Sequence, residues 1–149
     1  MPLADLLTTT DEDARSGADS IPASTAHSSP DSDRIDIKGF DIVPLSILWA
    51  YLANQEWNVS LIEAFECVFT GFDNDGPWIY KVPEDFVGLL VQLQADSLKS
   101  AAKFWAQTEE LARFAEHSPL LVEQTLSSIV TLARRARSLN QALYLWMDL

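Results

Sequence analysis

The stretch Trp78-Ile79-Tyr80-Lys81-Val82 decides the fold class, because its aromatic and β-branched residues are typical of a β-strand. The turn-forming run at 71–77, Gly-Phe-Asp-Asn-Asp-Gly-Pro, precedes it. A lone strand would leave its backbone N–H and C=O groups unpaired, so the chain needs a second strand. The segment 142–147, Ala-Leu-Tyr-Leu-Trp-Met, is the best partner. We therefore expect a small antiparallel β pair, and removal of residues 142–149 should unfold or aggregate the domain.

Most of the chain after residue 40 has apolar residues at helical spacings of three and four, which predicts about five helices. Pro44 and Pro119 fit first turns, where a missing backbone N–H costs nothing. Ser60 with Glu63 forms a capping-box pattern, and Asn140 suits the left-handed position that ends a helix. The expected fold class is α+β and helix-dominated: the β pair of about 78–82 and 142–147, with helices over about 44–54, from 60 to 67 or 70, from 83 onward, over 97–115 behind an N-cap at Asp96, and over 119–139.

The first 34 residues form a separate block that is rich in Ser, Thr, Asp, Ala and Pro and contains no aromatic residue. So few apolar residues cannot offset the entropy lost on ordering, and we expect residues 1–34 to be a disordered acidic tail. Aromatic residues begin at Phe40. We therefore place the core in a single globular helical domain at 35–149, which is long enough to fold without a metal or a disulfide.

The formal net charge is −12 and the pI is near 4.3. Nucleic-acid binding draws most of its affinity from Lys and Arg, and anionic membranes attract the same residues, so we expect neither partner. A basic protein is the partner that the charge favours. No apolar run approaches the roughly 18 residues of a membrane span, and the N-terminus lacks the basic flank of a secretory signal, so a cytoplasmic location is expected.

No pattern of reactive residues indicates chemistry. If Gly76 took the sixth position of a calcium-binding loop, Gly71 and Val82 would occupy positions that need carboxylates. The two histidines, His27 and His117, lie in the expected tail and in a loop, and Cys67 sits among apolar residues as a small core residue. We therefore expect no catalytic residue, no cofactor and no metal.

The five tryptophans are the remaining signal, and Trp49, Trp105 and Trp146 fit core positions. Trp57 and Trp78 flank loops, and aromatic residues carry much of the energy of protein interfaces. With the acidic turn before Trp78, they give the predicted partner-binding residues Trp57, Asp73, Asp75 and Trp78. The predicted function is a non-enzymatic protein-binding module, immunity- or adaptor-like, for a basic partner. The alternative is a hydrolase or transferase whose site assembles from dispersed residues such as Glu63, Glu66, Asp73, His117 and Arg135.

The segment 44–149 resembles small acidic bacterial proteins of unknown function. The features that carry the resemblance are Leu48-Trp49, Gly76-Pro77-Trp78, the run Trp-Ala-Gln-Thr-Glu-Glu at 105–110 and the ending Leu-Tyr-Leu-Trp-Met at 143–147. These are packing and turn residues. The resemblance therefore implies a fold and no activity, and it assigns no functional residue.

Overall fold

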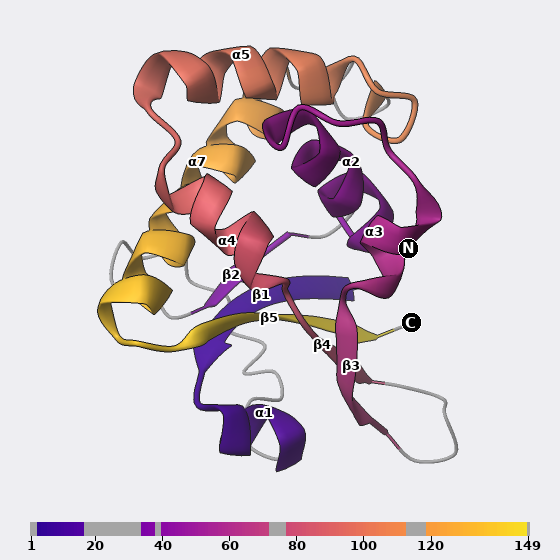
Figure 1. Ribbon diagram of the computed structural model, residues 1–149, viewed down its shortest axis with the longest axis vertical. Helices are drawn as coiled ribbons and strands as arrows, with labels where there is room; N and C mark the ends of the chain where they lie inside the picture. Colours follow the sequence, from indigo (N-terminus) through magenta and orange to yellow (C-terminus); the bar gives the residue numbers. More distant parts are fainter. Residues whose placement is uncertain (1–2, 17–33, 38–39, 72–76, 113–118, 149) are drawn as a thin grey trace.

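A five-stranded antiparallel sheet, with helices on both of its faces, forms the framework of the described residues (Figure 1). The computed structural model describes residues 3–16, 34–37, 40–71, 77–112 and 119–148. Helices α2, α4, α5 and α7 lie on one face of the sheet and the short helix α1 lies on the other (Figure 1). The elements in chain order are β1 (Leu3–Thr9), α1 (Asp11–Ser16), β2 (Arg34–Asp36), α2 (Ile42–Leu52), α3 (Val59–Glu63), β3 (Glu66–Thr70), β4 (Trp78–Lys81), α4 (Glu84–Val91), α5 (Ala95–Ala106), α7 (Pro119–Ser138) and β5 (Ala142–Asp148).

The C-terminal strand β5 is the centre of the sheet, whose strand order is β2-β1-β5-β4-β3. On one side β5 pairs with β4, with Tyr80 opposite Leu145, so the predicted pairing of these two segments is confirmed. On its other side β5 pairs with the whole of β1, from Leu3 opposite Asp148 to Thr9 opposite Ala142. The predicted fold class, with only a small β pair, is therefore wrong, because β1, β2 and β3 extend that pair into a full sheet.

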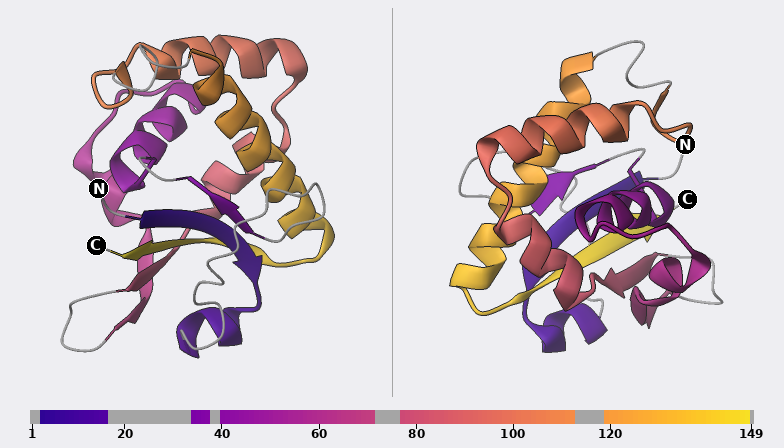
Figure 2. Two further views of the ribbon diagram at one scale, coloured as in Figure 1. Left: turned by 180° about the vertical axis from the view of Figure 1, so that it is seen from behind. Right: turned by 45° about the horizontal axis from the view of Figure 1, so that its top comes forward.

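Strand β1 comes from the segment that was expected to be a disordered tail. Residues 3–16 form β1 and α1, so the expected disorder does not hold for them, while residues 17–33 lie outside the described residues. Leu6 faces the helical layer and Leu7 faces α1, with exposed fractions of 1% and 5%. Viewed from behind, β1 runs beside β5 along its length (Figure 2). The prediction used the average composition of residues 1–34, in which the apolar residues of β1 are outnumbered by polar residues.

Strand β3 replaces the second half of a predicted helix. The capping-box pattern predicted a helix from Ser60 to 67 or 70, but α3 ends at Glu63 and its N-cap is Asn58, whose side chain accepts a hydrogen bond from the Ser60 N–H. Residues Glu66–Thr70 form β3 instead, which pairs with β4 with a register shift between Cys67 and Phe69. Cys67 is exposed on this edge strand rather than buried in the core as predicted.

The other helices lie near their predicted positions, with shifted ends. Asp41 caps α2 by accepting a hydrogen bond from the Val43 N–H, which places Pro44 within the first turn. Helix α5 begins at Ala95 behind the N-cap Gln94, so Asp96 lies in its first turn, and the helix ends at Ala106 rather than near 115. Asn140 has a φ of 56°, which confirms the predicted left-handed stop after α7.

The main core fills the space between the sheet and the helical layer. Helix α5 packs on α2 and α7, on their side away from the sheet (Figures 1 and 2). Trp105 joins these helices: its side chain is fully buried and its Nε1 donates a hydrogen bond to the Pro44 carbonyl oxygen at 2.8 Å. Trp49 and Trp146 are also buried, so the three predicted core tryptophans are confirmed. None of the helices described is long and apolar enough to cross a membrane.

Candidate functional site

An open groove lies between the C-terminal half of α2, the loop after it and α5, with a volume of about 850 Å³. Three aromatic side chains line it: Tyr51 from the last turn of α2, Trp57 from the loop and Phe104 from the last turn of α5. Polar lining is supplied by Asn54, Gln55, Glu56, Asp96, Ser97 and Ser100. The groove therefore combines a partly apolar wall with a polar rim, which is the anatomy of many protein contact surfaces.

Tyr51 and Phe104 form the wall of the groove as a stacked pair. Their ring centroids are 4.3 Å apart and their planes differ by 17°. Each lies beside the buried stripe of its helix rather than in it, since Trp49 and Trp105 are buried while Tyr51 and Phe104 remain 38% and 36% exposed. Two exposed rings that already stack on one another form a rigid apolar surface.

The Trp57 ring is fixed in place by its polar edge. Its Nε1 donates a hydrogen bond to the Ser46 Oγ at 2.9 Å, and the Ser46 hydroxyl donates to the Val43 carbonyl oxygen at 2.8 Å. Ser46 is completely buried in α2, whereas 44% of Trp57 is exposed. The indole N–H is therefore satisfied inside the protein while much of the ring faces solvent.

The loop that carries Trp57 leaves α2 through a defined turn. Asn54 has a φ of 56°, its N–H donates to the Tyr51 carbonyl oxygen, and the Gln55 N–H donates to the Ala50 carbonyl oxygen at 3.0 Å. This pair of bonds is a Schellman motif, which satisfies the carbonyl groups left free at a helix end. The turn thus directs the next residues, Glu56 and Trp57, along the groove.

The charge of the groove is negative. Among its described lining residues, Glu56 and Asp96 carry carboxylates, and none is a lysine or an arginine. The chain as a whole carries a net charge of −12. A cationic group approaching this groove would therefore meet favourable charge both locally and from the whole molecule.

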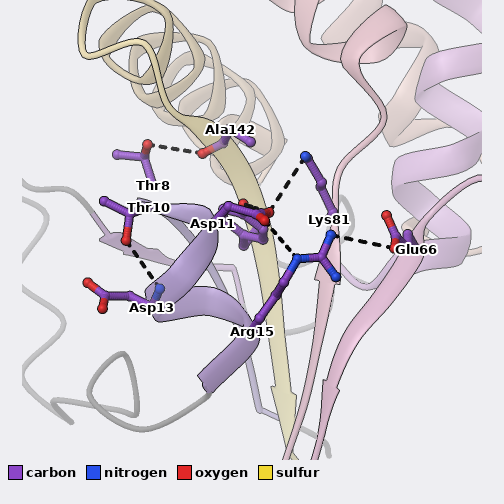
Figure 3. Close-up of polar contacts among 9 residues, drawn as sticks. Thr8, Thr10, Asp11, Asp13, Arg15, Glu66, Lys81 and Ala142 are labelled. Carbon is purple, nitrogen blue, oxygen red and sulfur yellow. Dashed lines mark hydrogen bonds and ion pairs between the residues drawn. The ribbon is translucent and has the colours of Figure 1, made fainter.

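A second group of polar side chains lies on the opposite face of the sheet, around Asp11 at the start of α1 (Figure 3). The Asp11 carboxylate accepts hydrogen bonds from Arg15 Nε at 2.7 Å and from the Tyr144 hydroxyl at 2.9 Å, and Lys81 Nζ lies 3.7 Å away. Arg15 also pairs with Glu66 at 3.7 Å. The hydrogen bonds from Arg15 and then Tyr144 lower the pKa of Asp11.

This Asp11 cluster holds α1 against the sheet. Its members come from α1, β3, β4 and β5: Arg15, Lys81 and Tyr144 contact the Asp11 carboxylate, and Glu66 contacts Arg15 (Figure 3). Between α1 and the sheet, Ala14 packs in a small apolar cluster with Leu7, Ile79, Tyr144 and Trp146. The cluster's charges are paired with one another, so its arrangement accounts for the position of α1 without a ligand.

The predicted partner-binding residues do not all lie together. Trp57 lines the groove, whereas Trp78 is half-buried at the start of β4, opposite Met147, and does not line it. Asp73 and Asp75 lie outside the described residues. Trp57 is the one described lining residue that the sequence predicted; the others, among them Tyr51, Glu56, Asp96 and Phe104, were not predicted.

The structure describes three of the five dispersed residues named for the alternative enzyme site. Glu66 is paired with Arg15, Glu63 ends α3 and Arg135 lies near the end of α7. Asp73 and His117 lie outside the described residues. Within the ranges that are described, no three His, Cys, Asp or Glu side chains are grouped so as to hold a metal ion.

The chain was also compared with known proteins. It matches no family model, no curated protein and no solved structure. The resemblance to small acidic bacterial proteins therefore stays a prediction that depends on its motifs.

Proposed function

We propose that this protein is a non-enzymatic module that binds a basic protein through the groove between α2 and α5. The observation that carries the proposal is the composition of that groove. It holds three exposed aromatic rings, two carboxylates and, among its described lining residues, no basic side chain.

The physical argument joins burial and charge. Exposed aromatic rings that are already held in place supply apolar area at a small entropic cost, and such residues dominate the energy of protein interfaces. The carboxylates of Glu56 and Asp96 select a partner of opposite charge and speed its approach. An immunity protein that blocks a basic enzyme and an adaptor that recruits a basic protein would both use such a surface.

The enzyme alternative has no comparable support. Asp11, Lys81 and Tyr144 line a pocket of about 460 Å³, but the ion pairs of the Asp11 cluster hold α1 on the sheet. A catalytic site would need groups that converge on an open space where a substrate could react. In the groove the converging groups are aromatic rings, amides, hydroxyls and two carboxylates, which suit recognition.

The test is a pull-down from a lysate of the source organism with three full-length baits, read by mass spectrometry. The baits are the natural chain, a groove variant with Glu56→Gln, Trp57→Ala and Asp96→Asn, and a control variant with Glu110→Gln and Leu120→Ala. Glu110 and Leu120 are exposed and lie outside the groove lining. Circular dichroism spectra verify that all three baits are folded.

We expect the natural and control baits to retain a basic protein that is released as salt rises from about 0.1 M to about 0.5 M, because salt screens surface charges. The groove variant should lose it. Retention by all three baits would place the site elsewhere, and the absence of a specific basic partner would overturn the proposed function.

A further inference from the structure

We infer that the groove recognises arginine: the guanidinium group of a partner's arginine stacks on the exposed face of Trp57 and donates hydrogen bonds to Glu56 and Asp96. This inference rests on the proposed function, which requires only a basic partner. It adds that the recognised side chain is arginine and that Ser46 positions the Trp57 ring that recognises it.

The Trp57 ring is held in position before any partner binds. Its only hydrogen-bonding group, Nε1, is occupied by the buried hydroxyl of Ser46. The exposed part of the ring therefore offers a partner apolar aromatic surface and no N–H donor. A ring held this way loses little rotational freedom on binding, so more of the contact energy is kept as affinity. Ser46 is thus a positioning residue.

A cation is the group that binds best to the face of such a ring. The negative face of an indole attracts cations more strongly than the faces of the other aromatic side chains, and nearby carboxylates add to the attraction. Trp57 and the carboxylate-bearing residues Glu56 and Asp96 line one groove, with no described lysine or arginine among the lining residues to compete.

Arginine suits this groove better than lysine does. A guanidinium group is planar and weakly hydrated, so it can lie flat on a ring and still donate in its own plane to two carboxylates. An ammonium group is compact and strongly hydrated, and it gains less from such a platform. The stacked rings of Tyr51 and Phe104 provide an apolar wall for the methylene groups of the arginine side chain.

The experiment is an NMR titration of the uniformly ¹⁵N-labelled full chain with three short Gly/Ser peptides, each with one central variable residue: arginine, lysine or neutral citrulline. The chain has five tryptophans, whose indole N–H resonances are assigned with single Trp→Phe variants. Trp57 is the reporter. Trp105 is the internal control, because it is fully buried and bonded to the Pro44 carbonyl oxygen.

We expect the arginine peptide to shift the Trp57 resonance and leave that of Trp105 in place, with affinity about fivefold higher than that of the lysine peptide. The citrulline peptide should bind at least as weakly as the lysine peptide. Ser46→Ala should reduce the preference for arginine over lysine toward unity, while Glu110→Gln, away from the groove, should leave the preference intact.

The outcomes separate this inference from the proposed function. Equal affinity for the arginine and lysine peptides, with both lost in the Glu56→Gln, Asp96→Asn variant, would overturn the arginine inference and leave a groove that binds basic partners. An arginine peptide that leaves the Trp57 resonance in place would also overturn it, whether or not other resonances shift. The pull-down decides the broader function independently of either result.

Discussion

At the scale of single residues, Tyr144 links the central strand β5 to α1. Its side chain is fully buried and its hydroxyl donates a hydrogen bond to Asp11 at 2.9 Å. Burial, followed by this hydrogen bond, raises the pKa of the Tyr144 phenol well above its ordinary value of about 10. The folded chain therefore favours the neutral phenol. The stability that the neutral Tyr144 phenol contributes is complete below about pH 10, and it declines as pH rises from there through the raised pKa.

The substitution Tyr144→Phe tests this account. Loss of the buried hydroxyl and its hydrogen bond should lower the free energy of unfolding by about 1 kcal/mol at pH 7. The variant should also lose less stability than the natural chain as pH rises above about 10, because it no longer has this phenol to ionise. Urea unfolding at several pH values measures both effects.

The control for this substitution is Tyr51→Phe, which removes the hydroxyl of a tyrosine that is 38% exposed and keeps its ring. It should leave the stability at pH 7 within about 0.5 kcal/mol of the natural value. A Tyr144→Phe chain whose unfolding follows the natural chain at every pH would show that the hydroxyl contributes nothing to the free energy of unfolding.

At the scale of elements, two helices end in the same way at asparagine. Asn54 after α2 and Asn140 after α7 both have a φ of 56°, and the following residue in each case donates back to a carbonyl oxygen five positions earlier. Asparagine tolerates this left-handed conformation better than other residues with a Cβ, and glycine adopts it freely. The two turns start the loop of the groove and the central strand β5, respectively.

Substitution at Asn140 measures what this helix end contributes. Asn140→Ala should lower the free energy of unfolding by about 1 kcal/mol, because alanine is strained at a positive φ, while Asn140→Gly should leave it unchanged or raise it slightly. Denaturant unfolding gives both values. Gln124→Ala, an exposed position within α7, is the control and should be nearly neutral. A destabilising Asn140→Gly would indicate that the side chain, and not the backbone conformation, is what matters.

The elements also show which patterns determine structure locally. The β4 segment was predictable because aromatic and β-branched residues cluster there, and β5 was predictable because β4 needed a partner strand. Asn140 was predictable because few residues suit a left-handed turn. Strand β3 was not, since the Ser60 and Glu63 pattern continued into apolar residues whose spacing also fits a helix. Short apolar runs leave helix and strand ambiguous until a partner strand is known.

The same limit applies to the groove. Trp57 could be singled out because a tryptophan between polar loop residues is hard to bury, and the structure leaves it 44% exposed. Tyr51 and Phe104 could not, because each lies within two residues of a core tryptophan in the same helix. Which of two neighbouring aromatics is buried depends on how α2 and α5 pack together. Candidate binding residues on helices therefore appear only once tertiary packing is known.

At the scale of the whole molecule, the first strand and the last strand depend on each other. Strand β5 lies between β1 and β4, and β1 pairs with it along seven residues. Removing residues 142–149 would therefore separate the sheet into two parts, a stronger reason for unfolding than the loss of one member of a small pair. Removing β1 would leave one edge of β5 unpaired and uncover the cores on both faces of the sheet.

Deletion of residues 1–10 is thus the test that distinguishes a structural strand from a disordered tail. Loss of a disordered tail would leave the melting temperature unchanged. Truncation of one buried leucine to alanine typically costs about 2–5 kcal/mol, whereas whole domains are stable by only about 5–15 kcal/mol. Because the deletion removes the buried side chains of Leu6 and Leu7 and a full set of strand hydrogen bonds, the truncated chain should unfold or aggregate.

Two point variants keep this prediction testable if the truncated chain cannot be purified. Leu6→Ala, at a position that is 1% exposed, should lower the free energy of unfolding by about 2–5 kcal/mol, while Glu12→Ala on the exposed side of α1 should stay within about 0.5 kcal/mol of the natural chain. Thermal melts followed by circular dichroism, with size-exclusion chromatography for aggregation, read all three. A truncated chain that melts like the full one would mean that β5 is stable without β1, and the sheet would then depend on β4 and the helical layer alone.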